Sequence, residues 1–187
     1  AWNPVKLVDP DGRDVWEINS KGKIVSHFED KSKDACFMVD DKGDRKETIS
    51  FDYGTIKDYK KSNFFRHTTS FDVSNQSAGA ELFKFFADNT MIEFGLINTE
   101  KDGSTVMTNH QQDQVGVSKK AKQMNDKGQK IMSIVHNHPH NSNPSGFEKG
   151  SKTGDRAAVS SLWSSLGYVL EHFVYKPNSN SLVLYDN

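Results

Sequence analysis

The sequence predicts an α+β fold in which a central β-sheet is flanked by helices and preceded by a small β-meander. Short segments of alternating or β-branched apolar residues recur along the chain, with turn residues between them, and these predict strands. Near residues 74–86 and 155–166 the apolar residues instead recur at helical spacing. A length of 187 residues suits one ordinary domain with a small appendage.

Two β-hairpins are expected in the first part of the chain. The first pairs residues 14–19 with 23–28, and the second pairs 36–39 with 48–51. Their similar Lys-Gly turns indicate a loose repeat, which suits a meander. We assign residues 1–58 to this unit and expect it either to connect the main domain to what precedes it or to cover one edge of the sheet that follows.

Residues 59–187 are assigned to the main domain, which begins with a basic connector at residues 59–63. Ser74, Asn75 and Ser77 are candidate caps for its first helix. A lysine-rich stretch at residues 118–130 predicts an exposed helix. The expected strands are residues 91–98, 104–108, 130–135, 172–175 and 181–185. Gly167 suits the end of the helix that starts near Asp155.

Composition excludes several classes of function. The formal net charge of -1 gives no overall attraction to nucleic acid or to an anionic membrane, so neither is expected as a partner. Cys36 is the sole cysteine, which excludes an internal disulfide and a cysteine-based zinc site. No apolar run approaches the roughly 20 residues of a membrane span. The first residues lack the features of a signal peptide, and we expect a piece of a longer protein.

A candidate metal site follows the strand at residues 130–135. Side chains alternate across a strand, so His136 and His138 point to one side and Asn137 to the other. Pro139 cannot donate a hydrogen bond to the sheet and should end the strand. Asp155 opens the next helix and can supply a third ligand. Three protein ligands and a water are typical of catalytic zinc.

Glu93 is the candidate general acid/base. It lies in an otherwise apolar strand, where an unpaired carboxylate is costly to bury, and a water activated by a metal is a suitable partner for it. The alternative is that Glu93 lies on the solvent side of an edge strand.

These residues resemble the motif of the JAMM (MPN/JAB) metalloproteases, which is a Glu, then His-x-His-Pro, about seven residues, Ser, two residues and Asp. Glu93 to Ile97 also resembles the Glu-x-Gly-Leu-Leu strand of that family. The resemblance covers residues 74–187 and implies a JAB/MPN-like (cytidine-deaminase-like) sheet between helices. It implies that His136, His138 and Asp155 bind Zn2+, that Glu93 is the general acid/base, and that peptide or isopeptide bonds are hydrolysed.

The chain departs from this motif before Asp155. The loop after Pro139 is longer than in the family, and Lys152 stands where the family has Ser. The hydroxyl that supports the oxyanion is therefore left open, and the candidates are Ser145, Ser151 and Thr153.

The segment Asn3 to Gly12 resembles the Asn-Pro to Asp-Pro-x-Gly signature that ends the core of RHS-repeat proteins, although Arg13 replaces the usual Leu. Together the two resemblances imply a JAB-like toxin domain of a bacterial polymorphic toxin. Such a domain would be secreted or delivered into a target cell as part of a larger RHS-type protein. The expected partners are a protein or peptide substrate, including isopeptide conjugates, and an immunity protein.

Two alternatives remain open from the sequence. The tripeptide His136, Asn137, His138 suggests an HNH-like nuclease, although the HNH residues of that class are spread over a ββα-metal unit. A non-catalytic MPN-like scaffold is the other, although scaffolds of that kind usually lose their ligands. His110 and His140 are not assigned to the site, although His140 is close enough in sequence to replace a ligand.

Overall fold

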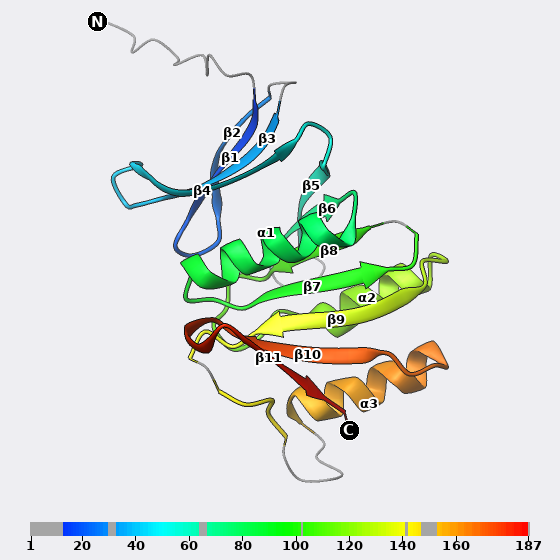
Figure 1. Cartoon of the computed structure of the whole chain (residues 1–187). Coiled ribbons are helices and arrows are strands. Elements are labelled where there is room, and N and C mark those ends of the chain that lie inside the picture. The colour runs from blue at the N-terminus through cyan, green and yellow to red at the C-terminus, as the bar shows by residue number, and fades with distance from the viewer. Residues whose placement is uncertain are drawn as a thin grey trace, which may run out of the picture.

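The computed structural model describes residues 13–29, 33–63, 67–101, 103–140, 142–146 and 153–186 (Figure 1). Within these residues the chain forms two β-sheets and three α-helices, a mixed α/β architecture that agrees with the predicted class. The RHS-like motif at residues 3–12 and the candidate Ser151 lie outside the described residues. No described helix combines the length and the apolar character needed to cross a membrane.

The N-terminal sheet contains both predicted hairpins, but the predicted meander is wrong. Its strands are β1 (Arg13–Asn19), β2 (Ile24–Phe28), β3 (Lys33–Val39) and β4 (Arg45–Asp52), in the order β2-β1-β3-β4. The two hairpins are joined through parallel pairing of β1 with β3, so β2 lies at an edge. Val15, Trp16 and Ile18 on β1 are buried, which suits a central strand, whereas Val25 on β2 is 55% exposed.

The second sheet has seven strands in the order β11-β10-β9-β7-β8-β6-β5. They are β5 (Ile56–Ser62), β6 (Thr68–Val73), β7 (Phe94–Thr99), β8 (Ser104–Thr108), β9 (Ile131–Asn137), β10 (Glu171–Lys176) and β11 (Ser181–Tyr185). Only β9 and β10 pair in parallel among these described strands, because α3 crosses between them.

The predicted connector at residues 59–63 is wrong, since this stretch belongs to β5 at the edge of the seven-stranded sheet. Strand β6, which pairs with it, was not predicted either. Only Ile56 of β5 is buried, and the exposed lysines hide the strand pattern in the sequence. Charged side chains of this kind are typical of edge strands, which they protect from pairing with other chains.

The helices lie on both faces of this sheet (Figure 1). They are α1 (Gln76–Asn89), α2 (Val117–Asn125) and α3 (Gly154–Leu166). The Asn75 side chain caps α1 by accepting a hydrogen bond from the Ala78 N–H, and Gly167 ends α3 with φ 77°. Helix α2 is shorter than the predicted 118–130, because the chain turns after Asn125.

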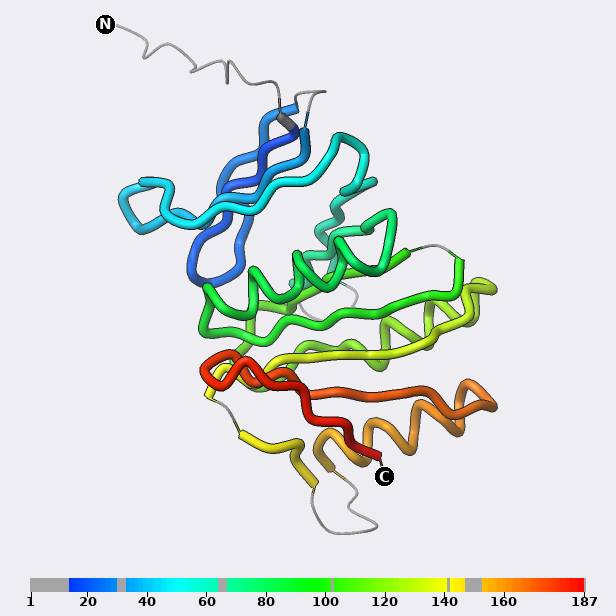
Figure 2. Tube along the Cα trace, in the orientation of Figure 1, coloured from blue at the N-terminus to red at the C-terminus, as the bar shows by residue number. Residues whose placement is uncertain are grey.

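One hydrophobic core joins the N-terminal sheet to the seven-stranded sheet. Trp16 and Met38 share it with Phe71, Phe86 on α1 and Phe94. A second core lies under α2 and α3, where the packed residues include Ile97, Met107, Ala121, Ile134 and Leu162. Figure 2 shows the chain passing from the N-terminal strands (blue to cyan) into α1 and the central strands (green), with the C-terminal hairpin (red) beyond β9.

The candidate site residues lie at one end of the seven-stranded sheet. β7 runs antiparallel to both β8 and β9, so the end of β9, the start of β7 and the end of β8 lie at the same end of the sheet. His136, Glu93 and Asn109 occupy these positions on three neighbouring strands. The antiparallel pairing therefore brings together Glu93 and His136, which lie more than 40 positions apart in the sequence.

Candidate metal centre

The imidazoles of His136 and His138 converge with the carboxylate of Asp155. The two Nε2 atoms are 3.1 Å apart. His136 Nε2 is 3.2 Å from Asp155 Oδ1, and His138 Nε2 is 3.4 Å from Asp155 Oδ2. One ligand atom from each residue falls within a 4.8 Å group that is able to hold a metal ion. The structure thus brings together the three residues singled out from the sequence.

The two histidines share a side of the chain because they are two positions apart at the end of β9. His136 is 4% exposed and His138 is 7% exposed. Beyond the last residue of β9, the His138 N–H still donates to the Tyr175 carbonyl of β10. The sheet therefore still holds the main chain at His138, the second candidate ligand.

The outer nitrogen of each imidazole has a neighbour that orients the ring. His138 Nδ1 lies 3.1 Å from the Ser142 carbonyl and 2.8 Å from the Ser142 hydroxyl. A carbonyl only accepts, so that bond requires the proton on Nδ1 and leaves Nε2 free to bind a metal. His136 Nδ1 lies 3.5 Å from the Tyr185 hydroxyl, and the two rings meet edge to face.

Asp155 is held by Ser145. The main-chain N–H and the hydroxyl of Ser145 both donate to Asp155 Oδ2, at 2.6 and 3.0 Å. In return the Ser145 hydroxyl accepts the Asp155 N–H at 2.9 Å. These reciprocal bonds fix the first turn of α3 and direct the carboxylate toward the two histidines.

Gly154 makes this contact possible. Its φ is +84°, a conformation that L side chains rarely adopt, and a Cβ there would lie 2.7 Å from the Ser145 hydroxyl oxygen. Gly154, the first residue of α3, therefore lies closer to Ser145 than a residue with a side chain could. A side chain at position 154 would push Ser145 away from Asp155.

Glu93 lies immediately before β7, and its carboxylate points toward the metal ligands. Its Oε1 is 3.8 Å from His138 Nε2, and the residue is 6% exposed. The alternative of a solvent-facing Glu93 is therefore wrong. The predicted strand at residues 91–98 included Glu93, whereas β7 begins at Phe94 and leaves Glu93 just before it.

Four hydrogen bonds fix the backbone around Glu93. Asn137 Oδ1 accepts the Phe94 N–H at 2.6 Å, and Asn137 Nδ2 donates to the Ile92 carbonyl at 3.1 Å. The Thr108 hydroxyl donates to the Glu93 carbonyl, and the Glu93 N–H donates to the Gln111 carbonyl, both at 2.7 Å. Neither Asn137 nor Thr108 was predicted as a site residue, and the alternation of side chains along β9 was the one sequence signal that placed Asn137 opposite the histidines.

The two carboxylates of the site have opposite pKa shifts. Burial would raise the pKa of Asp155, but hydrogen bonds with His136 and His138 outweigh burial and hold that pKa below its usual value. For Glu93, burial and then the negative charges of Asp155 and Asp113 raise the pKa to about 9. Asp155 is thus stabilised as an anion, which suits the binding of a cation. Glu93 is instead favoured in its protonated form.

Of the three candidate hydroxyls, the structure places that of Ser145 beside Asp155. Thr153 is the exposed N-cap residue of α3, and Ser151 lies outside the described residues. Ser145 lies ten positions before Asp155, a longer separation than in the family motif. The long loop explains why spacing alone did not identify it.

The other two histidines near the motif do not join the ligand group. His140 is exposed, and the three-residue group found among the described residues does not include it. His110 bonds to Thr69 and to the Lys21 carbonyl instead.

Comparison with known proteins identifies the central part of the chain. Residues 71–160 match the family model described as JAB-like toxin 1, a range that begins in β6, ends in α3 and includes Glu93, His136, His138 and Asp155. No curated protein and no solved structure gave a significant match. The match supports a JAB-like toxin domain that includes residues 71–160.

Proposed function

We propose that the chain is a zinc-dependent peptidase or isopeptidase that acts as the toxin effector domain of a larger, RHS-type secreted protein. The observation that carries the hydrolase proposal is the convergence of His136, His138 and Asp155 beside the buried carboxyl group of Glu93. The toxin role is supported by the family match at residues 71–160.

The donor set fits zinc. A tetrahedral zinc site with bonds of about 2.0–2.1 Å has neighbouring ligand atoms about 3.3 Å apart. The three nearest distances between His136, His138 and Asp155 are 3.1, 3.2 and 3.4 Å. Two neutral imidazoles and one carboxylate leave a fourth position open, as in catalytic sites. When bound, zinc lowers the pKa of a coordinated water to about 7 and polarises a carbonyl as a Lewis acid.

Glu93 is proposed to move the protons of the reaction. Its carboxyl group lies 3.8 Å from a ligand nitrogen, so it reaches the attacking water without being needed as a ligand. Burial favours its protonated form, whereas a cation held by the neighbouring ligands favours its ionised form. These opposing effects suit a group that takes a proton from water and donates it to the leaving amine.

The nuclease alternative has less support. The Asn137 side chain bonds to Ile92, before β7, and to Phe94, its first residue, and does not point to the ligand group, so the tripeptide does not act as one unit. The scaffold alternative requires that the site hold no metal, although all three ligand residues converge.

The test is hydrolysis of a fluorogenic peptide library by zinc-loaded protein. Glu93→Gln should lower the rate at least about a hundredfold while zinc stays bound. Glu47→Gln on the exposed surface of β4 is the matched control and should leave the rate unchanged. Unchanged activity in Glu93→Gln would remove this residue from the mechanism. Cleavage of plasmid DNA with magnesium would support the nuclease, and less than about half an equivalent of zinc would support the scaffold.

A further inference from the structure

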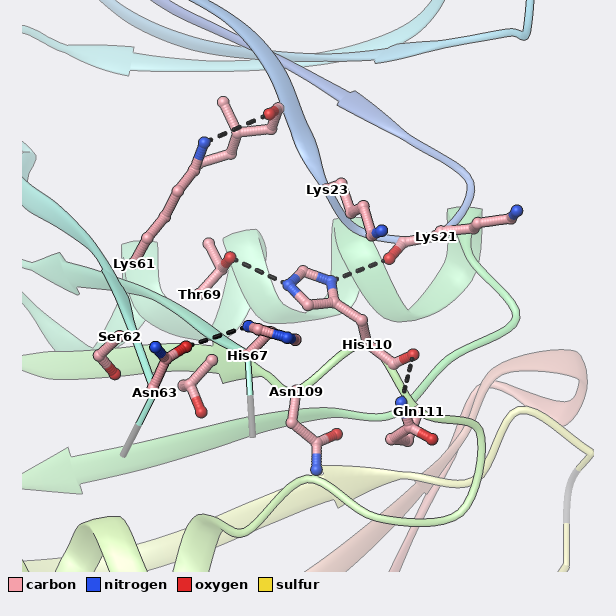
Figure 3. Close-up of a pocket in the computed structure, with 12 residues that line it drawn as sticks. Lys21, Lys23, Lys61, Ser62, Asn63, His67, Thr69, Asn109, His110 and Gln111 are labelled. Carbon is pink, nitrogen blue, oxygen red and sulfur yellow. Dashed lines mark hydrogen bonds between the residues drawn. The ribbon is translucent and has the colours of Figure 1, made fainter. Parts of the chain in front are cut away.

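A pocket of about 1130 Å³ lies between the N-terminal sheet and the seven-stranded sheet (Figure 3). Four segments line it: the turn between β1 and β2, the end of β5, the start of β6 and the loop after β8. Its walls belong to both sheets, and the common core holds these sheets together. The pocket is therefore a fixed feature of the fold.

The lining of this pocket is positively charged. Lys21, Lys23 and Lys61 contribute ammonium groups, and the described lining residues include no Asp or Glu. None of the three lysines forms an ion pair within the described part of the chain, whereas the adjacent Lys60 pairs with Asp58 and Asp72. The Lys61 Nζ contacts the Ile24 carbonyl at 3.5 Å. Among the described residues, no carboxylate therefore pairs with the lysines of the pocket.

His110 forms the centre of one wall (Figure 3). Its Nδ1 donates to the Lys21 carbonyl at 3.0 Å, and its Nε2 lies 3.1 Å from the Thr69 hydroxyl. Its φ of 62° is uncommon for a residue other than glycine, so the surrounding contacts fix this conformation. Burial lowers the pKa of His110, and the positive charges of Lys23 and Lys61 lower it further.

A buried amide next to this wall also has no partner. Asn109 is 1% exposed, and neither its Oδ1 nor its Nδ2 has a hydrogen bond within the described structure. Most buried polar groups are paired, and an unpaired one marks a place where a ligand or an ordered water completes the bonding. This observation points to a bound group independently of the lysines.

The pocket shares hydrogen bonds with the backbone of Glu93. The Gln111 carbonyl accepts the Glu93 N–H, and the Thr108 hydroxyl donates to the Glu93 carbonyl while accepting the His110 N–H. Strand β9, which carries His136, is four strand positions from β5. At about 4.8 Å per strand this separation is about 19 Å, a length that about six extended residues cover.

We propose that this pocket binds an acidic segment of the polypeptide substrate, at least about four residues from the bond that is cut. The inference rests on the proposed peptidase function. The positive charge of the lysines is complementary to the negative charge of carboxylates. The polar side chains of Ser62, Asn63 and Gln111 can form hydrogen bonds with a peptide main chain.

A nucleic acid has less support as the occupant, because the chain's formal net charge of -1 gives no overall attraction to a polyanion. The three lysines precede residue 71, so this subsite lies mostly outside the segment that matches the family model.

The first experiment measures binding without cleavage. Fluorescence anisotropy of a labelled six-glutamate peptide is compared between wild type, Lys23→Gln/Lys61→Gln and the matched control Lys42→Gln/Lys101→Gln, whose lysines are exposed and outside the pocket. We expect roughly tenfold weaker binding in the pocket variant only. Equal binding of a six-glutamine peptide, equal loss in both variants, or tighter binding of oligothymidylate would overturn the proposal.

The second experiment measures cleavage of a peptide library. Peptides cut by the wild type should be enriched in Asp and Glu at the distant positions, and the pocket variant should lose this enrichment while still cutting neutral peptides. Cleavage without any acidic preference would overturn the inference and leave the peptidase standing. Binding of the acidic peptide without cleavage of any peptide would reject the peptidase, and with it the assignment of that peptide as a substrate.

Discussion

The Asn137 side chain hydrogen-bonds the residues on both sides of Glu93. It accepts the Phe94 N–H at 2.6 Å and donates to the Ile92 carbonyl at 3.1 Å. Because Asn137 lies between the two histidine ligands, one stretch of β9 positions both the metal ligands and the candidate acid/base. The pairing thus sets the position of Glu93 relative to His138.

Asn137→Ala tests this relationship. The change leaves two buried main-chain groups without partners, so we expect a loss of about 2–4 kcal/mol in the free energy of unfolding. It should also lower the hydrolytic rate of the fraction that remains folded, because Glu93 loses its anchor. Asn98→Ala is the control, since the Asn98 side chain bonds to Ser133 and Ser104 between the same strands without touching the Glu93 segment. Equal kinetic effects in both variants would argue against a positioning role.

Zinc should stabilise the fold. A ligand that binds only the folded state at about one hundred times its Kd adds about 2.7 kcal/mol, which raises Tm by several degrees. Removing zinc with EDTA should reverse this shift in a calorimetric scan. His138→Ala should abolish the zinc-dependent shift, whereas His140→Ala, an exposed neighbour, should keep it. A zinc-induced shift that survives in His138→Ala would place the ion elsewhere.

Ser145→Ala distinguishes two roles for the hydroxyl. If the hydroxyl acts by holding Asp155, its loss should weaken zinc binding about 10- to 100-fold, measured by competition with a chromogenic chelator. If it instead supports the oxyanion, zinc affinity should stay unchanged and the rate should fall. The structure favours the first result. Ser164→Ala, an exposed position on α3, is the control for both measurements.

His172 should make the fold sensitive to acid. Burial, with a smaller effect of nearby His136, lowers the pKa of His172 to about 4. The unfolded chain binds this proton near pH 6.5, so stability is complete above that pH and declines as the pH falls toward 4. This difference in the pKa of His172 between the folded and unfolded chain contributes roughly 2–3 kcal/mol to the free energy of unfolding.

His172→Phe should remove this part of the acid response, measured by urea denaturation at several pH values. EDTA is present throughout, so that loss of zinc does not contribute. Phe keeps a ring against Trp163 and Tyr185, which the imidazole contacts edge to face. The exposed His67→Phe is the control. An unchanged slope between pH 4 and 6.5 in His172→Phe would contradict the prediction.

The sequence predicted best where local patterns and burial agree. Asn75 and Gly167 mark the ends of their helices, and the strands around residues 104–108 and 131–137 are apolar and buried. Periodicity also placed His136 and His138 on one side. These features depend on short-range geometry, which a single sequence carries.

Features that depend on distant partners were missed. β5 looks like a polar connector because its position at the sheet edge exposes its charges. Within the helical pattern at residues 155–166, Ala158 is exposed and Val159 is fully buried, which spacing alone does not show. The link from Ser145 to Asp155 spans a loop whose course no periodic pattern encodes. The pairing of β1 with β3 in parallel likewise has no local signal.

The two sheets share one hydrophobic core, which limits where a longer precursor could be cut without exposing apolar surface. A break near residue 58 would separate Trp16 and Met38 from Phe71 and Phe86. The fragment after the break would then expose an apolar patch and be prone to aggregate. If the chain is processed and delivered as proposed, the cut therefore falls upstream of β1, and the small N-terminal sheet stays with the part that carries the candidate metal site.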